Sequence, residues 1–488
     1  MEDLLPPKDT PNLSDSVRKA DEPSMKAGIR QAWGSALMFG LGECSFGLFA
    51  AQLTMPARWF GYLGGVPQLI GPLAQALSAN LLDRFGCRKR LVLIPVIVQM
   101  LAMVPLALVA VYCLVNGIPT PAAEKSLFAR ENLLYLCFLA SAFLYYVAGH
   151  FTNPPWTSLI SEVVPSTLRQ RYFARSSHNV SFLTLVSQSA VGGALYIAGL
   201  QAQEGSRMRM AMWIFALAFA LSVAARGYAW VQIRRVQDPL YTATAETQFT
   251  FWQFIRRVRE SNFVHFVLFT ATIGFGANLS GPYFLPYWTY DLKYQTWQWQ
   301  ILSVAGTLST IITMMFWGRF SERFGNKKTL QYTSIWIGIS PLFWLFSCDF
   351  YYLVFINMLT GASWAGFGLS AWNYILDAVS APKRARCMAY FNIINGFAGF
   401  TGAMIATWLE PILPARAIGA CATTRFYWLL VLSAGFRMLA LVLLPTFKEL
   451  RSVKEFSLRH WIFQITSVRT PLGFVLDYFT NDDDENER

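Results

Sequence analysis

The chain has 488 residues, of which 54% are hydrophobic, 16% aromatic and only 14% charged, and its formal net charge is +12. Soluble globular chains carry about 25% charged residues, so this composition excludes an ordinary water-soluble protein. It does not indicate a nucleic-acid partner either, because the Lys and Arg residues form short clusters between long apolar runs, as in the loops of membrane proteins.

Twelve apolar stretches follow one another along the chain, each long enough to cross a bilayer as a helix, which takes about 20 residues. The expected spans are 31–54, 58–80, 91–115, 132–153, 179–201, 209–232, 263–289, 298–319, 330–347, 351–374, 388–410 and 424–445. The link after the ninth, at Cys348 and Asp349, is very short. The spans predict an all-α, polytopic membrane protein.

The positive charges predict the orientation of these spans. Most of the 40 Lys and Arg residues fall in the tails and loops on the side of the N-terminus. The positive-inside rule then places both termini in the cytoplasm. We expect an integral protein of a bacterial inner (plasma) membrane.

Internal repeats predict two bundles of six helices. The matching segments are DRFGCRK (83–89) with ERFGNKK (322–328), WTSLISEVVPSTLRQR (156–171) with WNYILDAVSAPKRAR (372–386), and LSVAAR (221–226) with LSAGFR (432–437). Their common order indicates two units in the same orientation, related by an axis along the membrane normal. The predicted parts are a flexible cytoplasmic tail (1–28), a first bundle (29–232), a cytoplasmic linker (233–262), a second bundle (263–445) and a cytoplasmic C-terminal tail (446–488).

The loop after the second span carries a family signature. Twelve spans in two halves with this D-R-x-G-x-R-K loop resemble the major facilitator superfamily, whose signature reads G-x-L-A-D-R-x-G-R-K/R. Ala79 replaces its leading glycine. The resemblance implies a secondary transporter that works by alternating access. It also implies a gating role for the loop residues of both halves, which are Asp83, Arg84, Gly86, Arg88, Gly318, Glu322, Arg323 and Gly325.

Two interpretations of this loop remain open. In the first, the Asp83 carboxylate faces the N-terminus of a helix in the other half, which is favourable by about 0.3–1 kcal/mol, and Arg88 holds the loop in place. In the second, the basic loop only fixes the topology. The seven cysteines show no paired metal-ligand spacing, and no nucleotide-binding or nucleophile–base pattern occurs. The sequence therefore predicts neither metal, cofactor nor enzymatic activity.

Glu43 stands near the middle of the first span, in FGLGECSFG. A carboxylate at that depth costs about 2.5–3.5 kcal/mol on insertion scales. It must therefore face a watery cavity, find a partner or hold a proton. We interpret Glu43 as the candidate for proton coupling or for contacting a cationic group, with a purely structural hydrogen bond between helices as the alternative.

Other polar and aromatic residues at membrane depth are candidates for the substrate cavity. They are Gln68, Tyr145, Tyr146, Asn153, Asn278, Tyr283, Trp364, Asn373, Asn392 and Asn395. The resemblance implies that spans one, four, seven and ten line that cavity. Asn392 and Asn395 are three residues apart and share a helix face.

The substrate prediction depends on the polar residues within the spans, which are Asn, Gln, Tyr and Trp and not paired cations. Arg226 and Arg437 lie toward the cytoplasmic ends of spans six and twelve and can extend to the interface. The resemblance implies that these two spans are peripheral, so we expect both arginines to have a structural role and to face away from the cavity. The sequence then favours a sugar-like or other neutral polar metabolite over an organic anion, with protons or another ion as the coupling ion. The expected partners are the bilayer and this solute, and the protein is expected to function as a monomer. The alternative is a non-transporting scaffold that acts as an assembly factor, a sensor, or a lipid- or pigment-binding protein.

Overall fold

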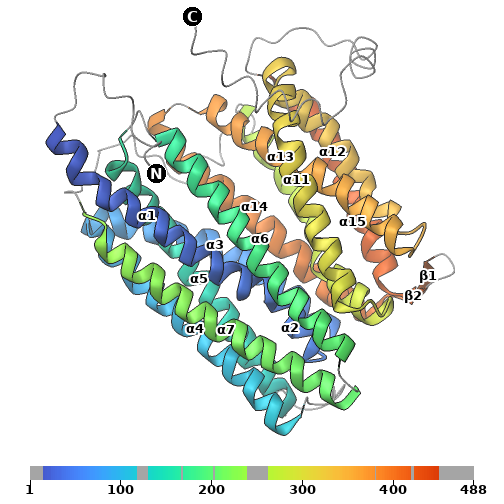
Figure 1. Ribbon diagram of the computed structural model, residues 1–488. Helices are drawn as coiled ribbons and strands as arrows, with labels where there is room; N and C mark the ends of the chain where they lie inside the picture. Colours follow the sequence, from blue (N-terminus) through green and yellow to red (C-terminus); the bar gives the residue numbers. More distant parts are fainter. Residues whose placement is uncertain are drawn as a thin grey trace, which may run out of the picture.

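The computed structural model describes residues 15–117, 130–165, 169–201, 204–238, 262–379, 381–418 and 422–449, most of which are helical (Figure 1). The first half contains α1 (Asp15–Leu41), α2 (Phe46–Gln52), α3 (Ala57–Phe85), α4 (Arg88–Asn116), α5 (Arg130–Val163), α6 (Arg169–Gln201) and α7 (Glu204–Arg235). The second half contains α9 (Asn262–Ser280), α10 (Phe284–Pro286), α11 (Thr296–Phe324), α12 (Asn326–Phe343), α13 (Phe350–Ala378), α14 (Ala381–Leu409) and α15 (Phe426–Ala440).

All twelve predicted spans coincide with helices, which confirms the all-α polytopic fold. The short link between the ninth and tenth spans is also present, because α12 ends at Phe343 and α13 begins at Phe350. Several helices are longer than predicted. α5 continues to Val163 and α6 begins at Arg169, so both extend into the basic segment between the predicted spans 132–153 and 179–201.

The predicted N-terminal tail is only partly accounted for. α1 begins at Asp15, so residues 15–28 are helical and the expectation of a flexible tail up to residue 28 is wrong for them. Lys26 and Glu22 form an ion pair one turn apart within this helix, which favours helix over coil. Residues 1–14, most of the predicted linker (239–261) and the predicted C-terminal tail from residue 450 lie outside the described residues.

The helices are apolar on their outer as well as their inner faces. In α4, Val92, Val96 and Leu106 are fully buried, whereas Ile94 and Leu108 are each 61% exposed. Apolar side chains all around a helix are typical of helices in a membrane. Among the described residues, nine helical segments are long and apolar enough to span a bilayer.

The helices α3, α12 and α14 are less apolar than these nine segments. Two of them, α3 and α14, pack along each other where the two halves meet. Their glycines allow this approach, since a Cβ added at Gly65 would lie 2.6 Å from the Ala403 Cβ. Helices that neighbouring helices cover need less apolar surface than helices that face lipid.

Apart from the contact of α3 with α14, the helices pack in two groups (Figure 1). Within the first half, α4 packs on α5 and α7, and α1 packs on α6 and α7. Within the second half, α11 packs on α13, and α9 packs on α14 and α15. Between the groups, the largest contacts join α3 to α14 and α6 to α11.

Each group has its own aromatic core. Phe46, Phe49 and Phe219 interlock in the first, with ring centroids of Phe49 and Phe219 5.2 Å apart. Phe266 and Tyr374 pack in the second at 4.5 Å. A short hairpin of β1 (Arg416–Ile418) and β2 (Ala422–Thr424), which the sequence did not indicate, joins α14 to α15.

Candidate functional site

The first helix of each half is interrupted in its second part by a 3-10 turn. In the first half the turn Glu43–Ser45 joins α1 to α2, and in the second the turn Gly281–Tyr283 joins α9 to α10. Irregular backbone at membrane depth is tolerated only where it faces protein or a water-filled cavity. These two turns therefore mark corresponding positions in the interior of each half.

Glu43 lies at the first of these turns and is held by tyrosines of α5. The Tyr145 hydroxyl donates a hydrogen bond of 2.7 Å to the Glu43 carboxylate, and the Tyr146 hydroxyl also reaches it. The two tyrosine rings pack edge to face with centroids 5.5 Å apart. Tyr145 is buried, while Glu43 and Tyr146 are partly exposed. The predicted residues Glu43, Tyr145 and Tyr146 thus form one cluster.

The two intramembrane arginines are buried within their bundles, so the prediction that they extend to the interface is wrong. Arg226 and Arg437 are each 5% exposed. Arg226 donates to Ser35 Oγ at 2.6 Å, and Arg437 donates to the Ile337 carbonyl at 3.1 Å and to Ser280 Oγ at 3.2 Å. These acceptors lie on neighbouring helices of the same half and hold the guanidinium groups within the bundle.

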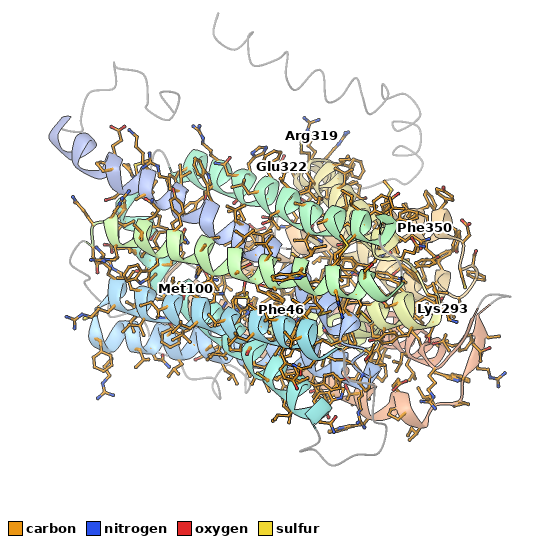
Figure 2. The ribbon with its side chains drawn as sticks, turned by 60° about the horizontal axis from the view of Figure 1, so that its bottom comes forward. Phe46, Met100, Lys293, Arg319, Glu322 and Phe350 are labelled. Atoms are coloured by element: carbon orange, nitrogen blue, oxygen red, sulfur yellow. The ribbon has the colours of Figure 1, made fainter. Side chains whose placement is uncertain are left out.

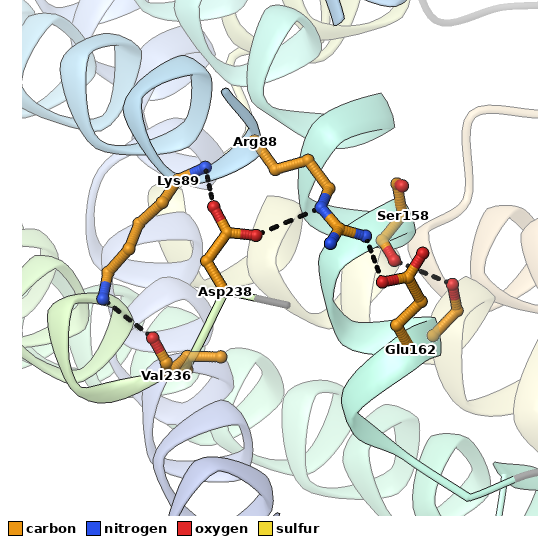
Figure 3. A network of polar contacts seen from close by, with 7 residues as sticks. Arg88, Lys89, Ser158, Glu162, Val236 and Asp238 are labelled. Carbon is orange, nitrogen blue, oxygen red and sulfur yellow. Dashed lines mark hydrogen bonds and ion pairs between the residues drawn. The ribbon is translucent and has the colours of Figure 1, made fainter. Parts of the chain in front are cut away.

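The basic loop of the first half is held by an ionic network (Figure 3). Arg88 is fully buried at the start of α4, and its Nη1 lies 2.7 Å from Glu162 Oε2 at the end of α5. Its Nε lies 3.1 Å from Asp238 Oδ1, just beyond α7. The Lys89 backbone N–H donates to Asp238 Oδ2 at 3.2 Å, and Lys89 Nζ donates to the Val236 carbonyl at 2.8 Å.

The second half repeats this arrangement with fewer charges. The Lys327 backbone N–H donates to Glu449 Oε2 at 2.7 Å, and Lys327 Nζ donates to the Phe447 carbonyl at 2.5 Å. Asn326, which is fully buried, donates to Asp377 Oδ2 at 2.8 Å. In both halves, the start of one helix is therefore tied to the segment that follows the sixth helix of that half.

This correspondence shifts the repeat alignment by one residue at the turn. The sequence motifs pair Lys89 with Lys328, but the contacts pair Lys89 with Lys327 and Arg88 with Asn326. The glycines before them remain equivalent, because Gly86 (φ 63°) ends α3 and Gly325 (φ 92°) ends α11. Both need the left-handed region that glycine adopts without strain.

The other predicted gating residues have simpler surroundings. Arg84 and Arg323 each stack on the following aromatic ring, at 5.5 Å from the Phe85 centroid and 5.4 Å from the Phe324 centroid. Glu322 is exposed at this end of α11, opposite the end near Lys293 (Figure 2). The side chain of Asp83 lies outside the described residues, so the gate role of its carboxylate stays a prediction. We refer to the end of the molecule that contains Gly86, Arg88, Gly325 and Lys327 as the loop end.

The two halves meet mainly at the end opposite the loop end. Gln188 of α6 donates to Ser303 of α11 at 3.1 Å, and Tyr290 donates to the Met55 carbonyl at 2.9 Å. An added Cβ at Gly61 or Gly65 of α3 would collide with Thr407 or Ala403 of α14. The close contacts of α3 with α14 run from its first turns to its middle, where an added Cβ at Gly396 would collide with the Gln68 carbonyl oxygen.

A polar chain crosses between the halves near the middle of the helices. Gln75 of α3 lies 3.1 Å from His150 Nδ1 of α5, and Asn392 of α14 donates to Gln75 Oε1 at 3.5 Å. Of the predicted pair Asn392 and Asn395, Asn392 is therefore the residue whose amide contacts the other half. Asn395 instead donates to the Phe391 carbonyl of its own helix at 2.9 Å.

The remaining cavity candidates separate into two groups. Asn278 and Trp364 line a common cavity of about 460 Å³ within the second half, together with Arg437. Tyr283 is buried and donates to Thr407 Oγ1 at 3.2 Å, so it packs the 3-10 turn Gly281–Tyr283 against α14 and is not among the residues that line that cavity. Gln68 and Asn153 are exposed, and Asn373 is half-buried; their role in the cavity stays a prediction.

Sequence reasoning missed four residues of the loop networks. Glu162 and Asp238 complete the Arg88 network, Asp377 accepts from Asn326, and Glu449 accepts from the Lys327 backbone N–H. The one available signal was positional, since Asp238 and Glu449 follow the matching arginines at the same distance of 12 residues. Among the described residues, no cluster of His, Cys, Asp or Glu could hold a metal ion.

Comparison with known proteins identifies the class of this fold. The crystal structure of the nucleoside transporter NupG superposes with a TM-score of 0.61 at 12% identity, covering 86% of this chain and 98% of the other. The inward open conformation of the xylose transporter XylE from E. coli gives 0.59 at 14%, covering 90% and 98%. A D-xylose-proton symporter gives 0.60 at 14%, covering 90% and 100%. No curated protein sequence matches the chain.

These structures share the fold of this chain over most of its length. The family model of the Major Facilitator Superfamily matches residues 266–470. This match covers most of the second half, and the fold of the chain is similar to that of the transporters above, so both findings agree with the superfamily resemblance of the loop signature.

Proposed function

We propose that the protein moves a small polar organic solute across a bacterial inner membrane by alternating access, as a monomer with both termini in the cytoplasm. The observation that carries this proposal is the asymmetry of the contact between the halves. The described hydrogen bonds and glycine contacts between them lie at the end opposite the loop end and near the middle of the helices. That arrangement corresponds to a transporter closed on one side, with the loop end as the open side.

The loop networks support a hinge between two rigid halves. Arg88 and Lys327 each bind partners from their own half, so the loops stiffen each half and do not fasten one half to the other. Rigid-body rocking of two repeats around a central site is the motion expected of such transporters. Within this picture, the 233–262 linker connects the halves and Asp83 contributes to the gate.

We further propose that Glu43 couples transport to protons. Glu43 is partly exposed as a residue, its carboxylate is held by the Tyr145 hydroxyl rather than by a cation, and no described residue forms an ion pair with it. A carboxyl group without a cationic partner at this depth is favoured in its protonated form. When the transporter opens to the other side of the membrane, the access of water to Glu43 changes, and the fraction of Glu43 that carries a proton changes with it.

The solute remains a class, not a compound. Asn278, Trp364, Asn392 and Gln75 offer the amide and aromatic groups that bind hydroxyls and rings. The nucleoside transporter and the D-xylose-proton symporter among the similar structures fit a neutral polar solute moved with protons. These residues are the candidate contacts for a sugar-like or similar metabolite.

Reconstitution into liposomes tests the proposal. A panel of sugars and nucleosides is screened for accumulation driven by an inward proton gradient, with Glu43→Gln compared with the native protein. We expect the variant to keep gradient-independent exchange of solute and to lose accumulation. Accumulation by Glu43→Gln with an unchanged pH profile would exclude proton coupling through this residue. Stable binding of a lipid or protein without any flux would instead indicate a non-transporting scaffold.

A further inference from the structure

The cavity of the second half contains a cation without a counter-charge. It lies between α9, α12, α13 and α15, and its volume of about 460 Å³ is in the range of small-molecule sites. Its walls include Trp288, Trp344, Trp364, Asn278, Asn357 and Arg437. None of its lining residues is an Asp or a Glu.

Arg437 is 95% buried and only partly satisfied. It donates two hydrogen bonds, to the Ile337 carbonyl and to Ser280 Oγ, both of them neutral acceptors. Its Nε has no acceptor, and no carboxylate lies within ion-pair distance, among the residues that the structure describes. Buried charges in proteins are normally paired, because an isolated charge loses its hydration without compensation.

The two halves differ in charge at their interrupted helices. Arg226 and Arg437 occupy matching positions in LSVAAR and LSAGFR. The 3-10 turn begins with Glu43 in the first half and with Gly281 in the second. Arg226 donates to Ser35 and Glu43 accepts from Tyr145, so the first half contains both an arginine and a carboxylate. In the second half a glycine stands in place of the carboxylate.

Gly281 leaves room for an exogenous group. It is exposed, it lines the cavity, and it follows Ser280, which binds Arg437. A Cβ added at Gly281 would have nothing within 4 Å. The space that a glutamate would fill is thus open, next to an arginine with a free N–H.

We propose that this cavity binds a singly charged anionic group beside Arg437, in the open space at Gly281, which is the position that Glu43 holds in the first turn of the other half. The group is either the carboxylate of a solute or a free halide. Binding is a property of the folded second half and holds whether or not the protein couples transport to protons. The reason for excluding organic anions, that both arginines face away from the cavity, does not apply to Arg437.

Iodide provides a probe, because three of the lining residues are tryptophans. Tryptophan fluorescence of the purified full-length protein is measured while sodium iodide replaces sodium fluoride at constant ionic strength. Iodide bound in the cavity gives a saturable quenching component in addition to the linear collisional one. Gly281→Glu supplies an internal carboxylate and is the decisive variant, with Gly281→Ala as its matched control.

We expect the saturable component in the native protein and in Gly281→Ala, and its loss in Gly281→Glu and Arg437→Gln. If Arg437→Gln does not fold, the two variants at position 281 decide. Linear quenching in the native protein, or a saturable component that persists in folded Gly281→Glu, overturns the proposal. Displacement of iodide by acetate identifies carboxylates as the ligand and displacement by chloride alone identifies a halide; displacement by neither contradicts the site.

Discussion

The contact between α3 and α14 predicts a substitution that shifts the protein from one state to the other. A Cβ added at Gly65 would lie 2.6 Å from the Ala403 Cβ and 3.0 Å from Met404 Cε. Carbon atoms pack best at about 3.5–4.0 Å, so Gly65→Ala requires the two helices to separate by roughly 1 Å. The Cβ of Ala403 is bonded directly to the backbone, so no side-chain rotation can move it away from the added methyl group.

The size of the effect follows from the cost of overpacking. Inserting a methyl group into a packed interface costs about 1–3 kcal/mol, which changes an equilibrium between two states by about 5- to 150-fold. This cost applies only to the state in which α3 and α14 touch at that end. The helix propensity of alanine, about 1 kcal/mol better than that of glycine, is the same in both states and cancels.

Distances between spin labels test this prediction, in a background without the native cysteines. One pair, at Phe85 and Trp372, reports on the loop end, and a second pair, at Leu200 and Tyr351, reports on the opposite end. All four residues are more than half exposed. We expect Gly65→Ala to shorten the first distance and to lengthen the second.

The matched control is Gly193→Ala in α6, where an added Cβ meets nothing within 4 Å. It carries the same change in helix propensity without the contact to α14. Distance distributions that are the same in Gly65→Ala and Gly193→Ala at both ends would refute the reasoning. They would mean that the two halves are not held together by the contact of α3 with α14.

Two further predictions concern charges at opposite ends of the molecule. Asp238→Asn weakens an acceptor of the fully buried Arg88 and should cost about 1.5–3 kcal/mol of stability. Glu449→Gln changes the corresponding network of the second half, which contains Asn326 instead of an arginine, and should lower the melting temperature less than Asp238→Asn does. An equal loss in the two variants would contradict this difference. Burial raises the pKa of Glu410, which Arg425 and Arg58 only partly oppose, so the folded protein binds this proton more tightly than the unfolded chain. Glu410→Gln should therefore stabilise the protein at pH 7, and this gain should disappear as the pH falls below the ordinary glutamate pKa; a gain independent of pH would show that the carboxylate is not responsible.

Much of the fold could be predicted from the sequence, because the membrane imposes strong local constraints. Backbone groups in lipid must be satisfied within each segment, so an apolar stretch of sufficient length becomes a helix regardless of its neighbours. All twelve spans follow from this rule. The duplicated loop motif and the matched arginines likewise indicated the repeat, and the signature indicated the family.

Contacts between distant segments depended on the tertiary structure. The sequence placed Arg88 in a loop, but its partners Glu162 and Asp238 lie 74 and 150 residues away, in positions that only the packing of α5 and α7 determines. The same holds for Glu43: the sequence indicated Tyr145 as a candidate for the cavity, but it could not predict the hydrogen bond between these two residues. The one-residue shift between Lys89 and Lys327 is visible only through their partners.

The sequence by itself determined that this chain crosses the membrane twelve times in two related halves, since hydropathy, charge and repeats are local properties of the chain. The tertiary structure alone decided which way the polar residues of those helices face. Arg437 illustrates the difference: by its position in the span it could extend to the interface, yet Ser280 and the Ile337 carbonyl hold it against a cavity. The direction of a buried side chain depends on the neighbours available to bind it, and those neighbours come from helices far away in the sequence.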